Sequence, residues 1–325
     1  MIVLTHDDVA ALLPMEQAIA VVAEAMKGVS AGTAQLPLRT VLPVGGDNRM
    51  GVMPGAIADP ACFGVKLVSL FPGNAELGLS SHRGAVVLFE AETGGAVAMM
   101  DASLLTAIRT AAASAVATRA LARDDAESLT LIGYGEQAEH HLAAMLAVRP
   151  LHRVTVAGRS AEKAAGFAAR AAADYPEVDF ASTTDLRAAV SGADIVCTLT
   201  AAPRAIVSGD WVRPGAHVNV VGSSIPSMRE VDDRMVERGA IWVDYLPSTL
   251  AQAGEIVDMI AAGTFAAGDL KGEIGALLAG DIAGRTAPDQ ITVYRSLGIA
   301  AQDLAAAHHV YVRARDAGLG QRVDF

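Results

Sequence analysis

A glycine-rich turn, set between a short β-prone run and a helical pattern, constrains the fold of this chain more than any other stretch. Residues 129–132 are mostly apolar and lead directly into Gly133–Ala138 (GYGEQA), after which a helical pattern begins. The spacing G-x-G-x-x-A in that context is typical of a dinucleotide-binding turn. Gly133 would form the tight turn, Gly135 would let a pyrophosphate approach the backbone, and Ala138 would let the helix pack closely on the strand. The alternative is an ordinary strand–helix turn, since glycine-rich turns are common.

The pattern that follows this turn predicts a parallel sheet. Strands are predicted at 129–132, 154–157, 178–181, 195–199, 217–221 and 241–243, with helices at 136–147, 161–173 and 185–191. Alternating strands and helices of this kind form a parallel sheet covered on both faces. We therefore expect an α/β fold with a Rossmann-type parallel sheet domain.

The first hundred residues predict a second, strand-rich module. Strands are expected at 36–42, 51–56, 63–71, 85–90 and 96–100, after an amphipathic helical region at 7–30. An alanine-rich helix at 104–123 would link the two modules. Residues 292–317 are predicted to be helical and to fold back on the first module. The expected fold is thus a Rossmann-type domain with a smaller α+β domain.

Composition narrows the function classes. A chain of 325 residues with 52% hydrophobic residues is expected to form two domains, each with its own core. The net charge of −11 argues against non-specific binding to nucleic acid or to anionic membranes. No signal peptide is evident, and Arg109 and Arg119 interrupt the alanine-rich helix, so we expect a soluble, cytoplasmic protein. Cys62 and Cys197 are expected to be buried thiols, and no metal-binding spacing is present.

Three cations interrupt apolar patterns in the first module: Arg39, Lys66 and Arg109. Any one of them alone is compatible with a solvent-facing side chain. Together, in an acidic protein with a nucleotide-binding domain, they indicate an anionic substrate. A carboxylate is favoured, because a bidentate arginine is the usual partner of that group. A lysine in a partly dry site can also have a pKa low enough to move protons.

The residues after the second Rossmann strand bear on the choice of cofactor. An NAD enzyme usually places an acid there for the ribose 2′-hydroxyl. This chain has Gly158, Arg159 and Ser160, with no acid, so NADP(H) is favoured and NAD(H) is the alternative. In that alternative Arg159 is solvated and Ser160 only caps the next helix. The pairs His140-His141 and His308-His309 lie on helical patterns and are expected at the surface.

Taken together, these residues make the chain similar to the ornithine cyclodeaminase/mu-crystallin family over nearly its whole length. The matching pieces are Leu38-Arg39, Gly64–Lys66, Val86–Gly94, Leu105–Ser114, Gly133–Ala138, Gly284–Thr286 and Ile291–Asp303. The resemblance implies a substrate-binding and dimerisation domain, 1–115, completed by a C-terminal helix, 302–325. It implies a Rossmann NAD(P)-binding domain at 116–301, and a homodimer formed through the sheet of the first domain.

The resemblance also implies roles for individual residues. Arg39 and Lys66 would hold the substrate carboxylate, and Lys66 would also donate or accept a proton, assisted by His82. Arg109 would contact the cofactor phosphates or the substrate, and Ser81 with His82 would line the nicotinamide side. The other cofactor-binding residues that the resemblance implies are Gly133, Tyr134, Gly135, Glu136, Gln137, Gly158, Arg159, Ser160, Thr198, Leu199, Thr200, Ser223 and Ser296.

One departure from the family pattern bears on the substrate. Ornithine cyclodeaminases carry an aspartate in the loop after the strand that ends here at Val221, and this chain has Ser224 at the matching position. Because serine supplies no negative charge for a distal amine, ornithine cyclodeamination is disfavoured. The expected activity is NAD(P)H-dependent reduction of Δ1-pyrroline-2-carboxylate or Δ1-piperideine-2-carboxylate to L-proline or L-pipecolate. The alternatives are a redox-neutral ornithine cyclodeaminase or cis-3-hydroxyproline dehydratase, an alanine dehydrogenase, and a non-catalytic NADPH-binding protein of mu-crystallin type.

Overall fold

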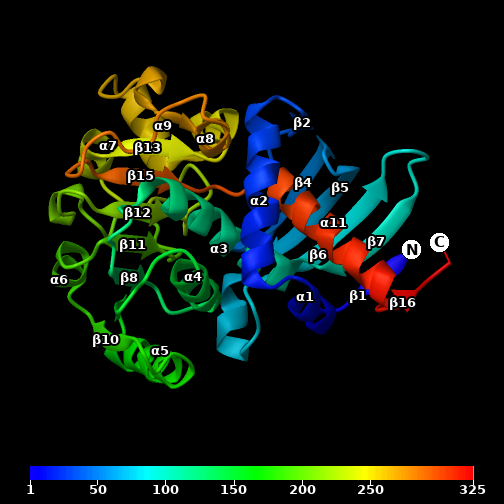
Figure 1. Ribbon diagram of the computed structural model, residues 1–325, viewed down its shortest axis with the longest axis horizontal. Helices are drawn as coiled ribbons and strands as arrows, with labels where there is room; N and C mark the ends of the chain where they lie inside the picture. Colours follow the sequence, from blue (N-terminus) through cyan, green and yellow to red (C-terminus); the bar gives the residue numbers. More distant parts are fainter. Residues whose placement is uncertain (325) are drawn as a thin grey trace. The chain divides into compact units, whose positions relative to one another are not determined.

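The computed structural model describes residues 1–324, with the side chains of residues 75 and 76 excepted, and it divides into two compact units (Figure 1). The first unit combines Met1–Ala113 with the C-terminal segment that begins at Gly298, and the second is Ser114–Leu297. Each unit is built on its own sheet. The expected fold class, a Rossmann-type domain with a smaller α+β domain, is confirmed.

The sheet of the first unit is mixed, with the strand order β16-β1-β7-β6-β5-β4-β2 and with β3 paired to β4. Among its described pairs only β1 and β7 run parallel. The strands are β1 (Ile2–Leu4), β2 (Ala34–Gln35), β3 (Thr40–Gly45), β4 (Asn48–Ala58), β5 (Ala61–Leu70), β6 (His82–Glu90), β7 (Ala96–Asp101) and β16 (Gln321–Arg322).

The helices of this unit are α1 (His6–Leu12), α2 (Met15–Ser30), the 3-10 segment η1 (Pro72–Leu77) and α11 (Ala300–Ala317), and α3 (Ala102–Leu121) continues into the second unit. The helical region expected at 7–30 consists of two helices, because the chain breaks at Pro14. Proline has no N–H to donate and its ring clashes with the preceding turn. Within residues 1–324 no single helix is long and apolar enough to cross a membrane, although α1 and α2 together, bent by 83°, reach that length and composition.

Helix α11 lies across one face of this sheet next to α2 (Figure 1). The close approach depends on Gly64 of β5, because a Cβ atom there would lie 2.9 Å from the side chain of Leu304 in α11. Alternate residues of a strand share a face. Lys66 therefore projects from β5 toward the same helix-covered face as Gly64, and it is only 2% exposed.

The sheet of the second unit is parallel throughout, with the order β10-β9-β8-β11-β12-β15-β13-β14. Its strands are β8 (Ser128–Ile132), β9 (Arg153–Ala157), β10 (Asp179–Thr183), β11 (Ile195–Thr198), β12 (His217–Val220), β13 (Ala240–Val243), β14 (Gly272–Glu273) and β15 (Thr292–Arg295). Its helical segments are α4 (Glu136–Leu146), α5 (Ala161–Asp174), α6 (Leu186–Ser191), η2 (Gly209–Trp211), α7 (Asp233–Arg238), α8 (Leu246–Gln252), α9 (Gly254–Ala261), η3 (Ala267–Asp269) and α10 (Ile274–Ala279).

Two expectations fail in this unit. Thr292–Arg295 is not the start of a helix but strand β15, fully buried between β12 and β13. His141 is not at the surface but fully buried, with Nδ1 2.8 Å from the Gln137 carbonyl oxygen and Nε2 3.0 Å from the Ser114 hydroxyl. A carbonyl only accepts, so Nδ1 carries the proton and Nε2 accepts from Ser114. Burial lowers the pKa of His141 to about 4, so the ring is neutral. Both cysteines are buried free thiols, as expected.

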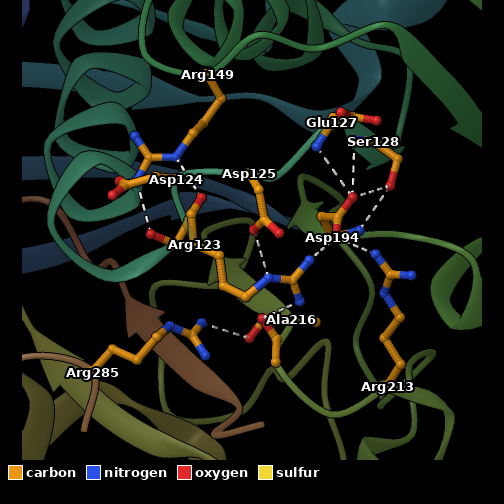
Figure 2. A network of polar contacts seen from close by, with 12 residues as sticks. Arg123, Asp124, Asp125, Glu127, Ser128, Arg149, Asp194, Arg213, Ala216 and Arg285 are labelled. Carbon is orange, nitrogen blue, oxygen red and sulfur yellow. Dashed lines mark hydrogen bonds and ion pairs between the residues drawn. The ribbon is translucent and has the colours of Figure 1, made fainter. Parts of the chain in front are cut away.

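A network of charged side chains fixes the amino-terminal ends of β8 and β11 (Figure 2). Asp194, immediately before β11, accepts hydrogen bonds from the Ser128 hydroxyl at 2.6 Å and from the backbone N–H groups of Ser128 and Glu127. Arg123 donates to it at 2.7 Å, and Arg213 donates to the same oxygen. This network lies at the amino-terminal ends of these strands, and the loops described below follow the carboxyl-terminal ends.

Candidate active site

The first unit buries a lysine and an arginine against one carboxylate. Lys66 Nζ donates to Asp303 Oδ1 at 2.9 Å and lies 3.4 Å from the Thr106 hydroxyl. Arg109 Nε donates to the same Asp303 oxygen at 2.8 Å, and its NH1 group donates to Gln302 at 3.0 Å. Lys66 is on β5, Arg109 is on α3, and Asp303 is in the first turn of α11. Residues far apart in sequence thus form one compact charged cluster.

Gly298 connects this cluster to the third predicted cation. Half-buried Arg39 donates to the Gly298 carbonyl oxygen at 2.7 Å. Gly298 has a φ of +72°, and a Cβ atom there would lie 2.5 Å from the guanidinium of Arg109. Only glycine therefore suits this position. The structure thus brings Arg39, Lys66 and Arg109 together, as their common appearance in apolar patterns suggested.

The cluster shifts the pKa of Lys66 into the range where a side chain can exchange protons. Burial is the largest cause, repulsion from Arg109 adds to it, and attraction to Asp303 opposes it, with the result that the pKa of Lys66 falls to about 7. Burial alone would raise the pKa of Asp303, but the charges of Arg109 and Lys66 outweigh it and hold that pKa below its usual value. Asp303 is therefore ionised, and Lys66 is divided between its two forms near neutral pH.

The Ser81-His82 pair belongs to the same unit. The Ser81 hydroxyl lies 3.0 Å from His82 Nδ1, at the beginning of β6. His82 is exposed as a whole residue, but desolvation is the largest cause that lowers the pKa of its imidazole. The charges of Lys66 and Arg109 lower that pKa further. The ring is thus neutral at pH 7 and lies within the electrostatic reach of Lys66.

The remaining predicted residues gather in the second unit at the carboxyl ends of five neighbouring strands. Gly133–Gln137 follows β8, and Gly158–Ser160 follows β9. Thr198–Thr200 lies at the end of β11, Ser223 follows β12, and Ser296 follows β15. The carboxyl ends of parallel strands are where α/β proteins bind their ligands. The carboxyl ends of these five strands are therefore the candidate cofactor site.

The local geometry at this edge fits a dinucleotide. Gly133 has a φ of +118°, which favours glycine, and Gly135 is the N-cap of α4 without any side-chain capping bond. A helix N-terminus that follows such a turn is a place where proteins bind phosphate groups. Among residues 1–324, the Ser296 hydroxyl and the Gln137 side-chain oxygen are buried without a hydrogen-bond partner. Both are polar atoms that a bound group would satisfy.

The side chains of several predicted cofactor residues form hydrogen bonds within the protein. Ser160 caps α5 by accepting from the Lys163 N–H, as the alternative for that residue proposed, and Arg159 is exposed. The Ser223 hydroxyl accepts from buried Arg295. The hydroxyls of Thr198 and Thr200 and the backbone N–H of Thr200 all donate to Glu230, so these groups are engaged within the protein.

The sequence reasoning missed two buried acids, Asp303 and Glu230. Asp303 stood within a matching piece of the family pattern, but an acid in the first turn of an alanine-rich helix has an ordinary capping explanation. Glu230 lies outside any motif. Each acid has a polar residue before it, Gln302 or Arg229, so no local apolar pattern in the sequence singles out either acid.

Known proteins resemble this chain over its full length. The sequence profile of the ornithine cyclodeaminase/mu-crystallin family matches residues 1–318. A Δ1-pyrroline-2-carboxylate reductase from Bacillus cereus is 33% identical over 329 residues, covering 100% of both chains. The ketimine reductase mu-crystallin of Mus musculus is 34% identical over 299 residues, 92% of this chain and 90% of that one. The solved structure of Thermococcus litoralis Δ1-pyrroline-2-carboxylate reductase with NADH and L-proline has a TM-score of 0.96 and 32% identity, covering 99% of this chain and 100% of that one.

Proposed function

Because this chain belongs to the ornithine cyclodeaminase/mu-crystallin family, we propose that it reduces Δ1-pyrroline-2-carboxylate to L-proline, and Δ1-piperideine-2-carboxylate to L-pipecolate. The chain is an oxidoreductase that acts on imines with a nicotinamide cofactor. The relatives described above and the positive charges of the first unit support the choice of these two cyclic substrates.

The observation that carries this proposal is the charge balance of the buried cluster. In the part of the chain that the structure describes, Lys66 and Arg109 share the single carboxylate of Asp303. Arg39 adds a further positive charge, which is felt at Lys66. The cluster therefore carries an excess of positive charge in a desolvated place, and a substrate carboxylate would neutralise it.

The side chains divide the chemistry between them. Bound NAD(P)H supplies the hydride. Arg39 holds the substrate carboxylate and fixes the orientation of the ring. Lys66, with a pKa of about 7, holds a proton at the imine nitrogen, and the protonated imine is the better hydride acceptor because its charge is neutralised as hydride arrives. His82, whose pKa is lowered in part by the charge of Lys66, assists in this proton transfer.

Two features refine the substrate and the cofactor. Residues 222–226, directly after β12, include Ser224 and no acid, so no carboxylate in this stretch pairs with a distal ammonium, and a ring without one is the better fit. Exposed Arg159 follows β9, where a 2′-phosphate would lie, so we propose a preference for NADP(H) over NAD(H).

We also propose a homodimer formed through the sheet of the first unit. Strand β3 is exposed along its whole length and carries Val41, Leu42 and Val44, of which Leu42 and Val44 are each 54% exposed. A contiguous exposed apolar strand of this kind is typical of an interface. Light scattering of the purified protein tests this proposal.

The test of the function is NADPH or NADH oxidation, followed at 340 nm with each cyclic ketimine, together with identification of the amino acid product. Arg39→Ala should raise KM strongly because the carboxylate anchor is lost, and Lys66→Ala should mainly lower kcat. Arg83→Ala, on the exposed part of β6, is the matched control and should keep wild-type kinetics. Arg159→Ala should reduce the preference for NADPH over NADH.

The proposal fails if the wild-type protein binds NAD(P)H but oxidises it with neither ketimine. Near-wild-type kinetics of both Arg39→Ala and Lys66→Ala would refute the assigned site, even if the protein reduces the imines. Turnover of ornithine or cis-3-hydroxyproline without net cofactor consumption would replace the reductase with a redox-neutral enzyme, and ammonia-dependent reduction of pyruvate would indicate an alanine dehydrogenase.

A further inference from the structure

Glu230 is a fully buried carboxylate in the segment between β12 and α7. Its two oxygens receive four hydrogen bonds. Oε1 accepts from the backbone N–H of Thr200 at 2.6 Å and from the Thr200 hydroxyl at 2.7 Å. Oε2 accepts from the Thr198 hydroxyl at 2.7 Å and from the backbone N–H of Gly222 at 2.6 Å. One side chain therefore holds the loop after β11 and the loop after β12.

All four hydrogen bonds of Glu230 come from groups in the two loops. Backbone N–H groups only donate, and a carboxylate has about four acceptor positions on its two oxygens, which is the number used here. Burial raises the pKa of Glu230, and the bonds from Thr200, Thr198 and Gly222 act in the opposite direction. Within residues 1–324 no lysine, arginine or histidine forms an ion pair with it. On balance the pKa of Glu230 is raised, and the side chain is held in place by its hydrogen bonds to the two loops.

The two loops are also packed against each other and against the glycine-rich turn. A Cβ atom at Gly222 would lie 2.1 Å from the Thr200 carbonyl oxygen and 2.7 Å from Glu230 Oε1. A Cβ atom at Gly133 would lie 2.9 Å from the Leu199 carbonyl oxygen. The loops after β8, β11 and β12 thus form one contiguous surface at the carboxyl edge of the sheet, with Glu230 directly beneath it.

The strand order indicates which half of a dinucleotide meets these loops. The turn after β8 accepts the pyrophosphate, and β9 and β10 lie on one side of it. β11 and β12 lie on the other side, where the order of the sheet reverses direction. With the adenosine on the β9 side, the loops after β11 and β12 face the nicotinamide half.

We propose that Glu230 is a positioning residue that fixes the loops after β11 and β12 for the nicotinamide half of the cofactor. This inference rests on the proposed nicotinamide cofactor and is independent of the imine substrate. Glu230 contacts the loops rather than the reacting atoms, so its removal should weaken only those ligands that carry a nicotinamide.

The experiment is isothermal titration of Glu230→Gln with four nucleotides: NADPH, NADH, 2′,5′-ADP and ADP. Glutamine keeps the size of the side chain, but its amide NH2 faces groups that only donate, so one of the N–H groups of Thr200 and Gly222 loses its acceptor. We expect NADPH and NADH to bind about tenfold more weakly. The two adenosine nucleotides, which lack the nicotinamide, should bind within about twofold of wild type.

Two further variants make the result decisive. Asp232→Asn, two residues away, keeps a good N-cap on α7 and should bind all four nucleotides like the wild type. Thr198→Val removes one donor to Glu230 with little change of shape, so it should show a smaller effect in the same direction even if Glu230→Gln does not fold.

Equal weakening of all four nucleotides, or unchanged binding of NADPH and NADH, in both Glu230→Gln and Thr198→Val would overturn the role of Glu230 alone. Failure of the wild-type protein to bind either NADPH or NADH would instead overturn the proposed cofactor, and this inference with it.

Discussion

Removing the charge of Asp303 should move the pH dependence of the reaction, because that carboxylate is the main group that keeps Lys66 protonated. Lys66 Nζ lies 2.9 Å from Asp303 Oδ1, and the pKa of Lys66 is about 7 in their presence. Two unit charges at that separation interact by about 6 kcal/mol at an effective dielectric constant of about 20. At about 1.36 kcal/mol per pH unit, the limit of the shift is about 4 units.

The expected shift in Asp303→Asn is smaller than this limit. The asparagine carbonyl still accepts a hydrogen bond from Lys66, and water relieves part of the remaining repulsion from Arg109 and Arg39. We therefore expect the pKa of Lys66 to fall by about one to two units. The direction is downward, since the group that favours the charged form has been removed.

The assay is the pH profile of kcat/KM for ketimine reduction, which reports the groups of the free enzyme. In the proposed mechanism protonated Lys66 is the active form in reduction, so wild-type activity should fall as the pH rises through about 7, and Asp303→Asn should show the same fall at lower pH. In the oxidation of L-proline, neutral Lys66 is the active form, so the rising limb should also move to lower pH. The titration of the substrate is common to both proteins and cancels in the comparison.

The matched control is Gln302→Leu. Gln302 is buried next to Asp303 and contacts Arg109, but it carries no charge, so its loss should leave the midpoint of the pH profile unchanged. If Asp303→Asn lowers the activity equally at every pH, without moving the midpoint, then Asp303 acts only on structure and the electrostatic reasoning is refuted.

Two further predictions concern the second unit. Gly133→Ala forces a side chain into a backbone with a φ of +118° and to 2.9 Å from the Leu199 carbonyl oxygen, so it should lower the free energy of unfolding by about 1 to 3 kcal/mol in urea titrations and weaken NADPH binding. Gly135→Ala meets no atom within 4 Å, so it should weaken NADPH binding with little loss of stability, and equal loss in both variants would contradict the close approach of a pyrophosphate. Asp194→Asn should cost about 2 to 3 kcal/mol at pH 7, because Arg123 loses its buried partner. Burial would raise the pKa of Asp194, but its hydrogen bonds and nearby arginines hold it below the usual value, so this stabilisation should be present above the unfolded pKa of about 4 and disappear as the pH falls through the lower folded value. A stability difference that stays constant from pH 7 to pH 3 would contradict that assignment.

The sequence predicts the second unit well where local rules act. The run before Gly133 is short and apolar, the turn has its required glycines, and the helix that follows has a clear period, so β8, the turn and α4 form as expected. β15 was missed because its four residues include Arg295, which reads as a polar helix residue. Burial against Glu255 and the Ser223 backbone makes the arginine compatible with a central strand, and no local pattern reports that pairing.

The candidate site was predictable for its cations and not for its acids. Lys66 and Arg109 stand out because each interrupts an apolar pattern within its own element, and Arg39 stands out in the mostly apolar run that leads into β3. Asp303 lies 237 residues from Lys66, and its effect on that lysine depends on α11 lying across β5. Such a long-range contact leaves no periodic signal in either segment, so it appears only when the fold is known.

The late position of Asp303 in the chain has a consequence for biosynthesis. A ribosome makes Lys66 and Arg109 long before it makes α11, and the whole of the second unit is translated in between. During that interval the first unit has two cations destined for burial and no counter-charge to bury with them, so its sheet should stay open on that face or recruit solvent ions. A released chain truncated after residue 297 should therefore carry a folded second unit attached to a protease-sensitive amino-terminal half, and the full-length chain should resist cleavage there.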